Sequence, residues 1–240
     1  MDFTGETQVR QIALSDPAAR RVLEEAGIDY CCGGSKSLGD ACLRANVTHQ
    51  EILERLRQNR ESRAPGEAEW AGADLSELTR HIRASHHEYV RGAIPRVRAM
   101  LVKVRAKHLE KHPEIGEVVR LFEEVAGEML MHMRKEEQIL FPYIDQLARA
   151  AREHSDLETP FFQTVANPIY MMMREHDSAG EVVRKIRRAT GDYQAPADAC
   201  TTFRASYQEL QQFEEDLHLH VHLENNILFP RAAELETAVL

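Results

Sequence analysis

Apolar residues recur every three or four positions along most of the chain from Asp74 onward, as in the run Phe122, Val125, Met129. This spacing places apolar side chains on one side of an α-helix, which then packs against its neighbours. Helix-starting and helix-ending residues divide the pattern into four long helices, over about 74–107, 114–152, 167–190 and 197–230. The chain from 74 to 240 therefore predicts an all-α, four-helix bundle.

Individual residues indicate where these helices start, bend or end. Asp74 is the expected N-cap of the first helix. Gly92 or Pro95 is expected to distort that helix, and Pro142 to strain or interrupt the second, because proline cannot donate a helical hydrogen bond. The fourth helix is expected to end near Pro230.

The amino-terminal residues predict a separate, small helical domain. One short helix begins at Ser15-Asp16-Pro17 and another spans Val47 to Asn59. The segment before Asp74 has little apolar content and is typical of a linker. The expected organisation is a helical domain over 1–60, a linker over 61–73 and the bundle over 74–240.

Composition narrows the environment in which the protein works. No apolar run approaches the roughly 20 residues that a membrane span requires, and the polar amino terminus lacks the apolar segment of a secretory signal. We therefore expect a cytoplasmic protein that does not enter membranes. A formal net charge of −9 gives no overall attraction for phosphate backbones, so nucleic acid is not an expected partner.

Cysteine and histidine content point to metal rather than to disulfides. Two of the four cysteines, Cys31 and Cys32, are adjacent, which is not the spacing of a secreted disulfide framework. The chain also contains 12 histidines in an acidic background. Neutral imidazole and carboxylate are ligand types that suit iron and its neighbours.

An internal repeat carries the strongest chemical signal. The string His-x-x-x-Glu-x-x-Ile-Leu-Phe-Pro begins at His132 and again at His220, and its glutamates are Glu136 and Glu224. Residues four apart lie one above the other on a helix, so each string places an imidazole and a carboxylate on one face. Those faces continue the apolar stripes, and a buried carboxylate needs a compensating cation. Each string therefore predicts a metal-ligand pair.

The other two helices are expected to supply matching histidines. The two strings are 88 positions apart, and His87 and His176 are 89 positions apart on the first and third helices. His86 is an alternative to His87, because the upstream apolar positions place it on their side of the helix. Periodicity alone leaves both open.

Four imidazoles and two carboxylates indicate a dinuclear iron or manganese site rather than zinc. A structural zinc site closes with four ligands and usually recruits thiolates, whereas a ferritin-type site would need Glu-x-x-His pairs. If both glutamates bridge and an oxo bridge also joins a pair of six-coordinate ions, about two positions stay open for a small molecule.

These residues resemble those of the Repair of Iron Centres proteins. The match covers nearly the whole chain and includes Asp29-Tyr-Cys-Cys-Gly-Gly34, both repeated strings and Glu175-His176-Asp177. The resemblance implies a hemerythrin-like bundle holding two non-haem iron ions, oxo-bridged when oxidised. It makes the histidines terminal ligands and the glutamates bridges, and so assigns the metal ligands His87, His132, Glu136, His176, His220 and Glu224.

The same resemblance implies accessory residues and a function. Glu128 and Glu175 would line a hydrophilic path, and Cys31 and Cys32 would assist from the amino-terminal domain. The implied role is repair of iron–sulfur clusters after nitrosative or oxidative stress, through iron delivery, nitric oxide handling or both. The alternatives are a nitric oxide or dioxygen buffer and an enzyme that reduces nitric oxide to nitrous oxide. The expected partners are damaged iron–sulfur proteins, the small ligand, an electron donor and, as one option, a second copy in a homodimer.

Overall fold

The computed structural model describes residues 3–15, 17–31, 33–58, 70 and 72–239. Helices account for nearly all of the regular structure in these ranges, and their β pairing is limited to an isolated bridge between Gln8 and Ser37. The predicted all-α fold is confirmed.

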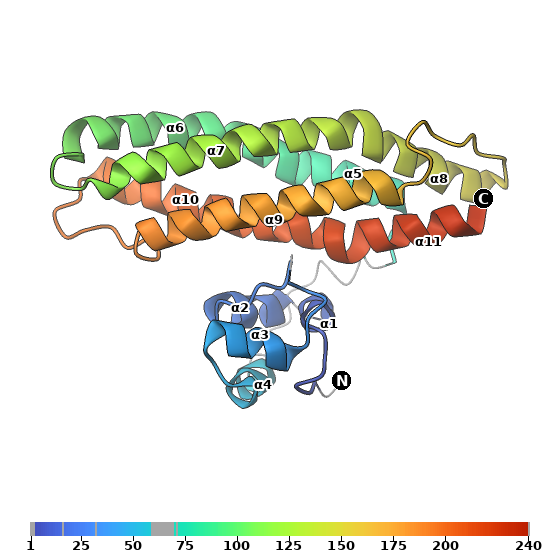
Figure 1. Ribbon diagram of the computed structural model, residues 1–240, viewed down its shortest axis with the longest axis horizontal. Helices are drawn as coiled ribbons and strands as arrows, with labels where there is room; N and C mark the ends of the chain where they lie inside the picture. The colour runs from blue at the N-terminus through green and yellow to red at the C-terminus, as the bar shows by residue number, and fades with distance from the viewer. Residues whose placement is uncertain (1–2, 16, 32, 59–69, 71, 240) are drawn as a thin grey trace.

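Four long helices run side by side to form the bundle (Figure 1). They are α6 (Glu88–His108), α7 (Glu114–Lys135), α9 (Ala166–Ala189) and α10 (Thr201–Leu223). Three shorter helices extend the bundle at one end, namely α5 (Leu75–Ile82), α8 (Phe141–Glu153) and α11 (Phe229–Val239). As predicted, the Asp74 side chain caps α5 by accepting a hydrogen bond from the Ser76 amide at 2.8 Å.

Short π-helical segments interrupt three of the four long helical paths. They are η2 (Arg83–His87), η3 (Glu136–Leu140) and η4 (Glu224–Leu228). The predicted distortion at Gly92 or Pro95 is wrong, because both residues lie inside α6 and the irregular turn precedes them. A π turn inserts one extra residue, which changes the direction of the side chains on either side of it.

Two of the π segments directly precede a Phe-Pro pair. The amides of Phe141 and Phe229 donate to the carbonyls of Glu136 and Glu224, five residues earlier. The interruption predicted near Pro142 is present, but the predicted end of the last helix near Pro230 is wrong, since α11 continues to Val239. Proline is tolerated at both places because it follows the π turn at the start of a new α-helical segment, where an N–H donor is not needed.

The apolar core has two parts. One cluster contains Val90, Met133 and Val221, and the other contains Ile82, Leu140 and Leu223. The polar residues of the repeated strings lie between these clusters. The bundle therefore encloses a polar centre between two apolar regions that exclude water from it.

The amino-terminal domain contains more helix than the sequence predicted. Pro17 begins α2 (Pro17–Glu25), and the second predicted helix corresponds to α4 (His49–Gln58). Two further helices, α1 (Val9–Ser15) and α3 (Leu38–Ala45), were not predicted, because each is too short to show a clear period. Asp16 and Asn59, at the predicted boundaries, lie outside the described residues.

Most of the predicted linker over 61–73 also lies outside the described residues. The part that is described packs on the bundle. The Trp70 ring stacks on His81 at 4.3 Å between ring centroids, and Arg231 donates to the Trp70 and Ala73 carbonyls at 3.0 and 2.6 Å.

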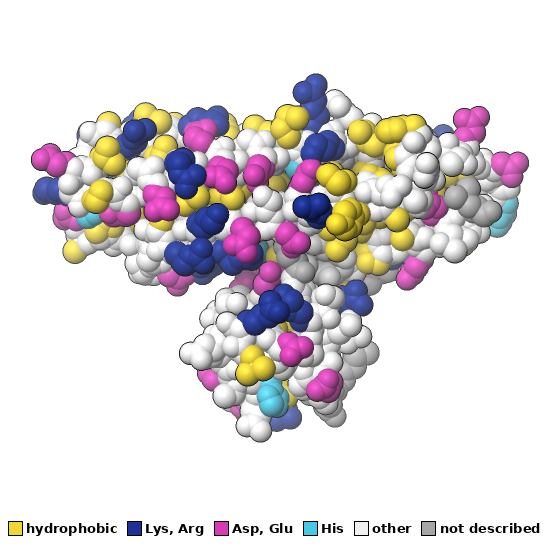
Figure 2. Space-filling model, viewed as in Figure 1, with side chains coloured by type: hydrophobic (Ala, Val, Ile, Leu, Met, Phe, Trp, Pro, Cys, Tyr) yellow, Lys and Arg dark blue, Asp and Glu magenta, His cyan; other side chains and the backbone are white. Residues whose placement is uncertain are grey.

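The surface carries no large field of one sign on the face that Figure 2 shows. Acidic and basic side chains are interspersed along the bundle there. Among the described helices, none has both the length and the apolar character needed to cross a membrane.

A buried glutamate ties the end of α11 to the connection between α8 and α9. Glu236 is 6% exposed and accepts hydrogen bonds from the Tyr143 hydroxyl and the Val165 amide, both at 2.8 Å, and from the Thr164 hydroxyl. Removing this carboxylate would leave buried donors without an acceptor.

We predict that Glu236→Ala lowers the free energy of unfolding by roughly 2 to 4 kcal/mol, the range expected when buried donors lose their acceptor. Urea denaturation followed by circular dichroism measures the change. The exposed neighbour Glu234→Ala is the matched control and should change stability little. Equal stability of the two variants would contradict the role assigned to Glu236.

Candidate metal centre

Six side chains predicted from the sequence meet at the middle of the bundle. Each is at most 1% exposed. They come from η2, α7, η3, α9, α10 and η4, in the order His87, His132, Glu136, His176, His220 and Glu224.

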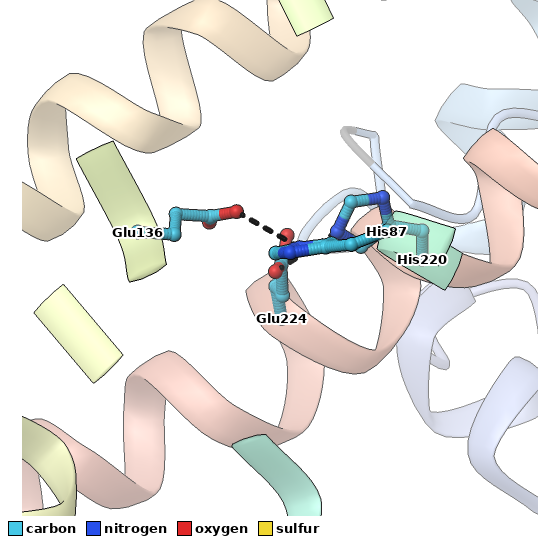
Figure 3. Close-up of side chains that lie close together, drawn as sticks. All are labelled: His87, Glu136, His220 and Glu224. Carbon is cyan, nitrogen blue, oxygen red and sulfur yellow. Dashed lines mark hydrogen bonds and ion pairs between the residues drawn. The ribbon is translucent and has the colours of Figure 1, made fainter. Parts of the chain in front are cut away.

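The six side chains form two overlapping groups. One contains His87 and His220, the other contains His132 and His176, and both contain the two glutamates. Within each group the potential ligand atoms all lie within 4.8 Å of one another. Figure 3 shows the first group, whose side chains point toward a common centre.

Glu136 lies between the two histidine pairs. Its Oε2 atom is 3.4 Å from His87 Nε2, and its Oε1 atom is 3.3 Å from His132 Nε2. One oxygen of this carboxylate therefore faces each group.

Glu224 repeats the arrangement from the opposite side. Its Oε1 atom is 3.1 Å from His220 Nε2, and its Oε2 atom is 3.1 Å from His176 Nε2. Two carboxylates that each offer one oxygen to two histidine pairs can bridge two cations.

The hydrogen bonding of the cluster is incomplete without a cation. Both carboxylate oxygens of Glu136, the Oε2 atom of Glu224 and the Nε2 atom of His87 are buried and have no hydrogen-bond partner among the described residues. Buried polar atoms without partners are costly, and a metal ion would use these lone pairs. Neither group contains a cysteine, and nitrogen and oxygen ligands suit iron. The residues present therefore fit a pair of iron ions.

Charge within the cluster is balanced by protons when metal is absent. Burial opposes ionisation of Glu224, but His220 and His176 outweigh it and hold the pKa of Glu224 well below its ordinary value. Burial likewise opposes protonation of His132, but Glu136 and Glu175 outweigh it and raise the pKa of His132 to about 10. The metal-free site thus combines carboxylates with imidazolium.

Two of the histidines are oriented by the residue that follows each shared glutamate. Nδ1 of His87 is 2.7 Å from Glu137 Oε1, and Nδ1 of His176 is 2.9 Å from Asn225 Oδ1. Such outer partners fix the ring so that Nε2 faces the metal. Sequence reasoning missed both residues, although they occupy the same position in the two repeated strings.

A third histidine is oriented by an expected acidic residue. Nδ1 of His132 is 3.1 Å from Glu175 Oε2, and Lys135 pairs with the other oxygen of Glu175. The hydrogen bond from His132, with that from Lys135, lowers the pKa of Glu175 to about 2. The other expected acidic residue, Glu128, is exposed and accepts a hydrogen bond from the Ser178 hydroxyl at 3.3 Å.

The structure gives His86 and His87 different places relative to the cluster. Both are buried and lie in the π turn of η2. His87 belongs to the cluster, whereas Nδ1 of His86 is 2.9 Å from Asp216 and its ring lies parallel to that of His220 at 5.5 Å. His86 therefore stacks on the ring of His220 without a hydrogen bond to it, whereas Glu175 is hydrogen-bonded to His132.

The amino-terminal domain contacts η4 beside the cluster. Nδ2 of Asn226 donates to the Tyr30 carbonyl at 3.2 Å and lies 3.0 Å from Nδ1 of His222. A Cβ atom on Gly34 would lie 2.9 Å from Asn226 Oδ1 and 2.6 Å from the Tyr30 carbonyl oxygen. Glycine at this position permits the close approach.

Of the predicted cysteine pair, Cys31 lies in the same loop. The Cys31 thiol is buried and donates to Asp29 Oδ1 at 3.2 Å. Cys32 lies outside the described residues. The described residues of this loop, from Asp29 to Cys31, thus lie beside the helical path that carries Glu224.

Known proteins resemble the chain in both of its parts. Residues 78–232 match a family model described as the hemerythrin HHE cation binding domain, and residues 5–60 match one described as a domain of unknown function (DUF542). The "Probable iron-sulfur cluster repair protein" of Haemophilus influenzae is 35% identical over 94% of this chain and 96% of its own length. The "Iron-sulfur cluster repair protein YtfE" of Citrobacter koseri is 34% identical over 92% of this chain and 94% of its own. The protein of that name from Salmonella paratyphi B is 35% identical over the same shares.

We predict that Glu224→Leu abolishes binding of the metal pair while the helices remain formed, because the variant loses an oxygen from both groups. Without metal, the variant should be less stable than the original chain, since removing one partner of a buried ion pair leaves His220 without its compensating carboxylate. Metal analysis and circular dichroism measure the two effects. Glu215→Leu, an exposed change on α10, is the control. Full metal content in Glu224→Leu would refute the ligand assignment.

We also predict that metal binding releases protons at pH 7. The pKa of His132 is raised, so its imidazole is protonated in the metal-free protein and must lose that proton before Nε2 can bind. Apparent affinity should therefore rise with pH until the pH reaches about 10. A pH indicator in weak buffer, read while Fe(II) is added without oxygen, measures the release. Metal binding without proton release would contradict the assigned protonation state.

Proposed function

This chain belongs to the hemerythrin HHE cation binding family and, over nearly its whole length, to the iron-sulfur cluster repair proteins, and on that premise we propose that it restores damaged iron–sulfur clusters with iron from a di-iron centre. The cofactor we propose is a pair of non-haem iron ions, oxo-bridged when oxidised. Bound iron would supply both the reactive centre and the cargo.

One observation carries the proposal: each shared glutamate offers one oxygen to each of two histidine pairs. Four histidines would be terminal ligands, and Glu136 and Glu224 would bridge. This arrangement holds two ions at fixed positions rather than a growing mineral, and it suits a defined amount of iron for each chain. The absence of thiolate from both groups favours iron over zinc.

The protonation behaviour of the site supports release of iron. Interaction with Glu136, Glu175 and Glu224 raises the pKa of His132, and interaction with Glu224 and Glu136 raises that of His220, although burial opposes both. These imidazoles would take up protons at Nε2 as iron leaves, which would keep positive charge beside the buried carboxylates. The emptied site would then remain folded and ready to reload.

A polar route supports transfer of iron between the centre and the surface. The Oε2 atom of Glu175 contacts the buried His132 ring, while the Glu175 side chain as a whole is 27% exposed. Lys135 neutralises the outer oxygen and is itself 42% exposed. We propose that iron enters and leaves past Glu175, with Glu128 further out along the same helix pair.

The amino-terminal loop and its partners complete the proposal. Cys31 and Cys32 would present thiolates to a damaged iron–sulfur protein, and docking of the loop on Asn226 would hold them beside the iron source. Cytoplasmic work is supported by Cys42 and Cys200, which take part in no disulfide.

The test is repair in a defined mixture. An iron–sulfur enzyme inactivated by nitric oxide is incubated without oxygen with the iron-loaded protein, a thiol reductant and sulfide, and recovered activity is measured. We predict recovery with the original chain, reduced recovery with Cys31→Ser, and no recovery above the metal-free level with Glu224→Leu. Glu215→Leu should behave as the original chain.

Nitrous oxide is measured in the same vessels. Many molecules of nitrous oxide per protein, with no recovery of the damaged enzyme, would replace repair by a reductase function. Stoichiometric loss of free nitric oxide without recovery would replace it by buffering.

A further inference from the structure

A second group of metal-ligand side chains lies at the far end of the bundle, away from α8 and α11. There the connection between α6 and α7 meets the segment that leads into α10 (Figure 1). His108 is the last residue of α6, and Cys200 is the N-cap residue of α10. His112 and Asp198 lie close to them in the two connections. None of these residues belongs to the central cluster.

The four side chains are already paired across the two connections. Nε2 of His108 lies 3.3 Å from Cys200 Sγ, and Nε2 of His112 lies 3.1 Å from Asp198 Oδ1. The His112 amide donates to the His108 carbonyl at 2.8 Å, which places the two histidines one helical turn apart. His-x-x-x-His on one segment thus faces Asp-x-Cys on the other.

The surroundings of the pairs are those of a supported ligand set. Nδ1 of His112 is 3.2 Å from Glu114 Oε1, the kind of carboxylate partner that metal-bound histidines usually have. The Phe203 ring packs against both imidazoles, with centroids 5.3 Å from His108 and 5.4 Å from His112. The His112 side chain is only 14% exposed.

We propose that His108, His112, Asp198 and Cys200 form a tetrahedral zinc site that joins the two connections at this end of the bundle. A thiolate, a carboxylate and two neutral imidazoles bring two negative charges, which Zn²⁺ balances. Thiolate is a ligand that zinc recruits and that the central cluster lacks. The ligand types therefore distinguish the proposed zinc site from the proposed iron site.

The geometry is close to that of such a site. With Zn–N near 2.0 Å and Zn–S near 2.3 Å, the edges of a tetrahedron are roughly 3.3 to 3.6 Å long, similar to both observed pair distances. The two pairs are still separate, because no three of the four donor atoms lie within 4.8 Å of one another, unlike those of the central groups. The imidazole centroids are 6.2 Å apart, and binding through both Nε2 atoms would bring them to roughly 5 Å. This shift of about 1 Å is between two side chains at the end of α6 and in the connection that follows it, and in the other connection Asp198 is 53% exposed and can turn.

Cobalt(II) is the first probe, because a Co(II)–thiolate bond gives an intense near-ultraviolet band and tetrahedral Co(II) a strong visible spectrum. It is added to the full-length, iron-loaded chain, with iron content followed in parallel. We expect one Co(II) per chain with a thiolate band, unchanged iron, and displacement of cobalt by Zn(II). Zinc should also raise the melting temperature. Cobalt binding without a thiolate band, or no binding beyond the central site, would overturn the proposal.

Variants locate the site. Cys200→Ser should remove the thiolate band, and His112→Ala should weaken binding more than about 100-fold, beyond the 10- to 100-fold loss typical of outer partners. Glu114→Gln should fall within that smaller range. Asp198→Asn replaces an exposed ligand and so should fold. Weaker Co(II) binding by this variant therefore tests the site even if Cys200→Ser fails to fold.

Cys42→Ala and His49→Ala, both in the amino-terminal domain, are the matched controls and should retain the band. A band that survives in Cys200→Ser and disappears in Cys42→Ala would overturn the assignment.

Discussion

Two carboxylates buried inside an apolar bundle are the constraint on which the rest of this structure depends. Glu136 and Glu224 have no exposed surface, and apolar clusters lie on both sides of them. An ionised carboxylate in such surroundings strongly destabilises the fold unless positive charge and hydrogen-bond donors compensate. Histidines from all four helical paths surround the two carboxylates, and His132 and His220, whose pKa values are raised by them, supply the compensating charge without metal. The same residues thus serve folding and chemistry.

The irregular turns of the bundle are concentrated at this centre. His87 ends η2, and Glu136 and Glu224 begin η3 and η4. Each π turn adds a residue, which moves the helix face that points inward and lets the following helix accept a proline. The helices therefore depart from regular geometry where the ligands require it.

The internal repeat gives the centre an approximate two-fold relation, but the outer residues break it. Glu137 and Asn225 occupy equivalent places, yet one is charged and the other neutral. Glu175 directly precedes His176 in the sequence and contacts His132. His86 directly precedes His87 and stacks on His220. The two proposed metal positions share their ligand types and differ in their surroundings, so they are expected to differ in affinity. Such a difference suits a centre that keeps one ion while it transfers the other.

The sequence by itself determined the all-α class, the four long helical paths and the spacing of His132 with Glu136 and of His220 with Glu224. These features are local, because helical period and the four-residue separation of a ligand pair are set within one segment. The tertiary structure gave His86 and His87 different places relative to the cluster, supplied Glu137 and Asn225 as outer partners, and brought together the distal histidine and cysteine pairs. The outer contacts join residues 43 to 50 positions apart, and the distal pairs join residues 86 and 92 positions apart. No periodicity within one helix encodes such contacts, which exist only once separate helices are packed side by side.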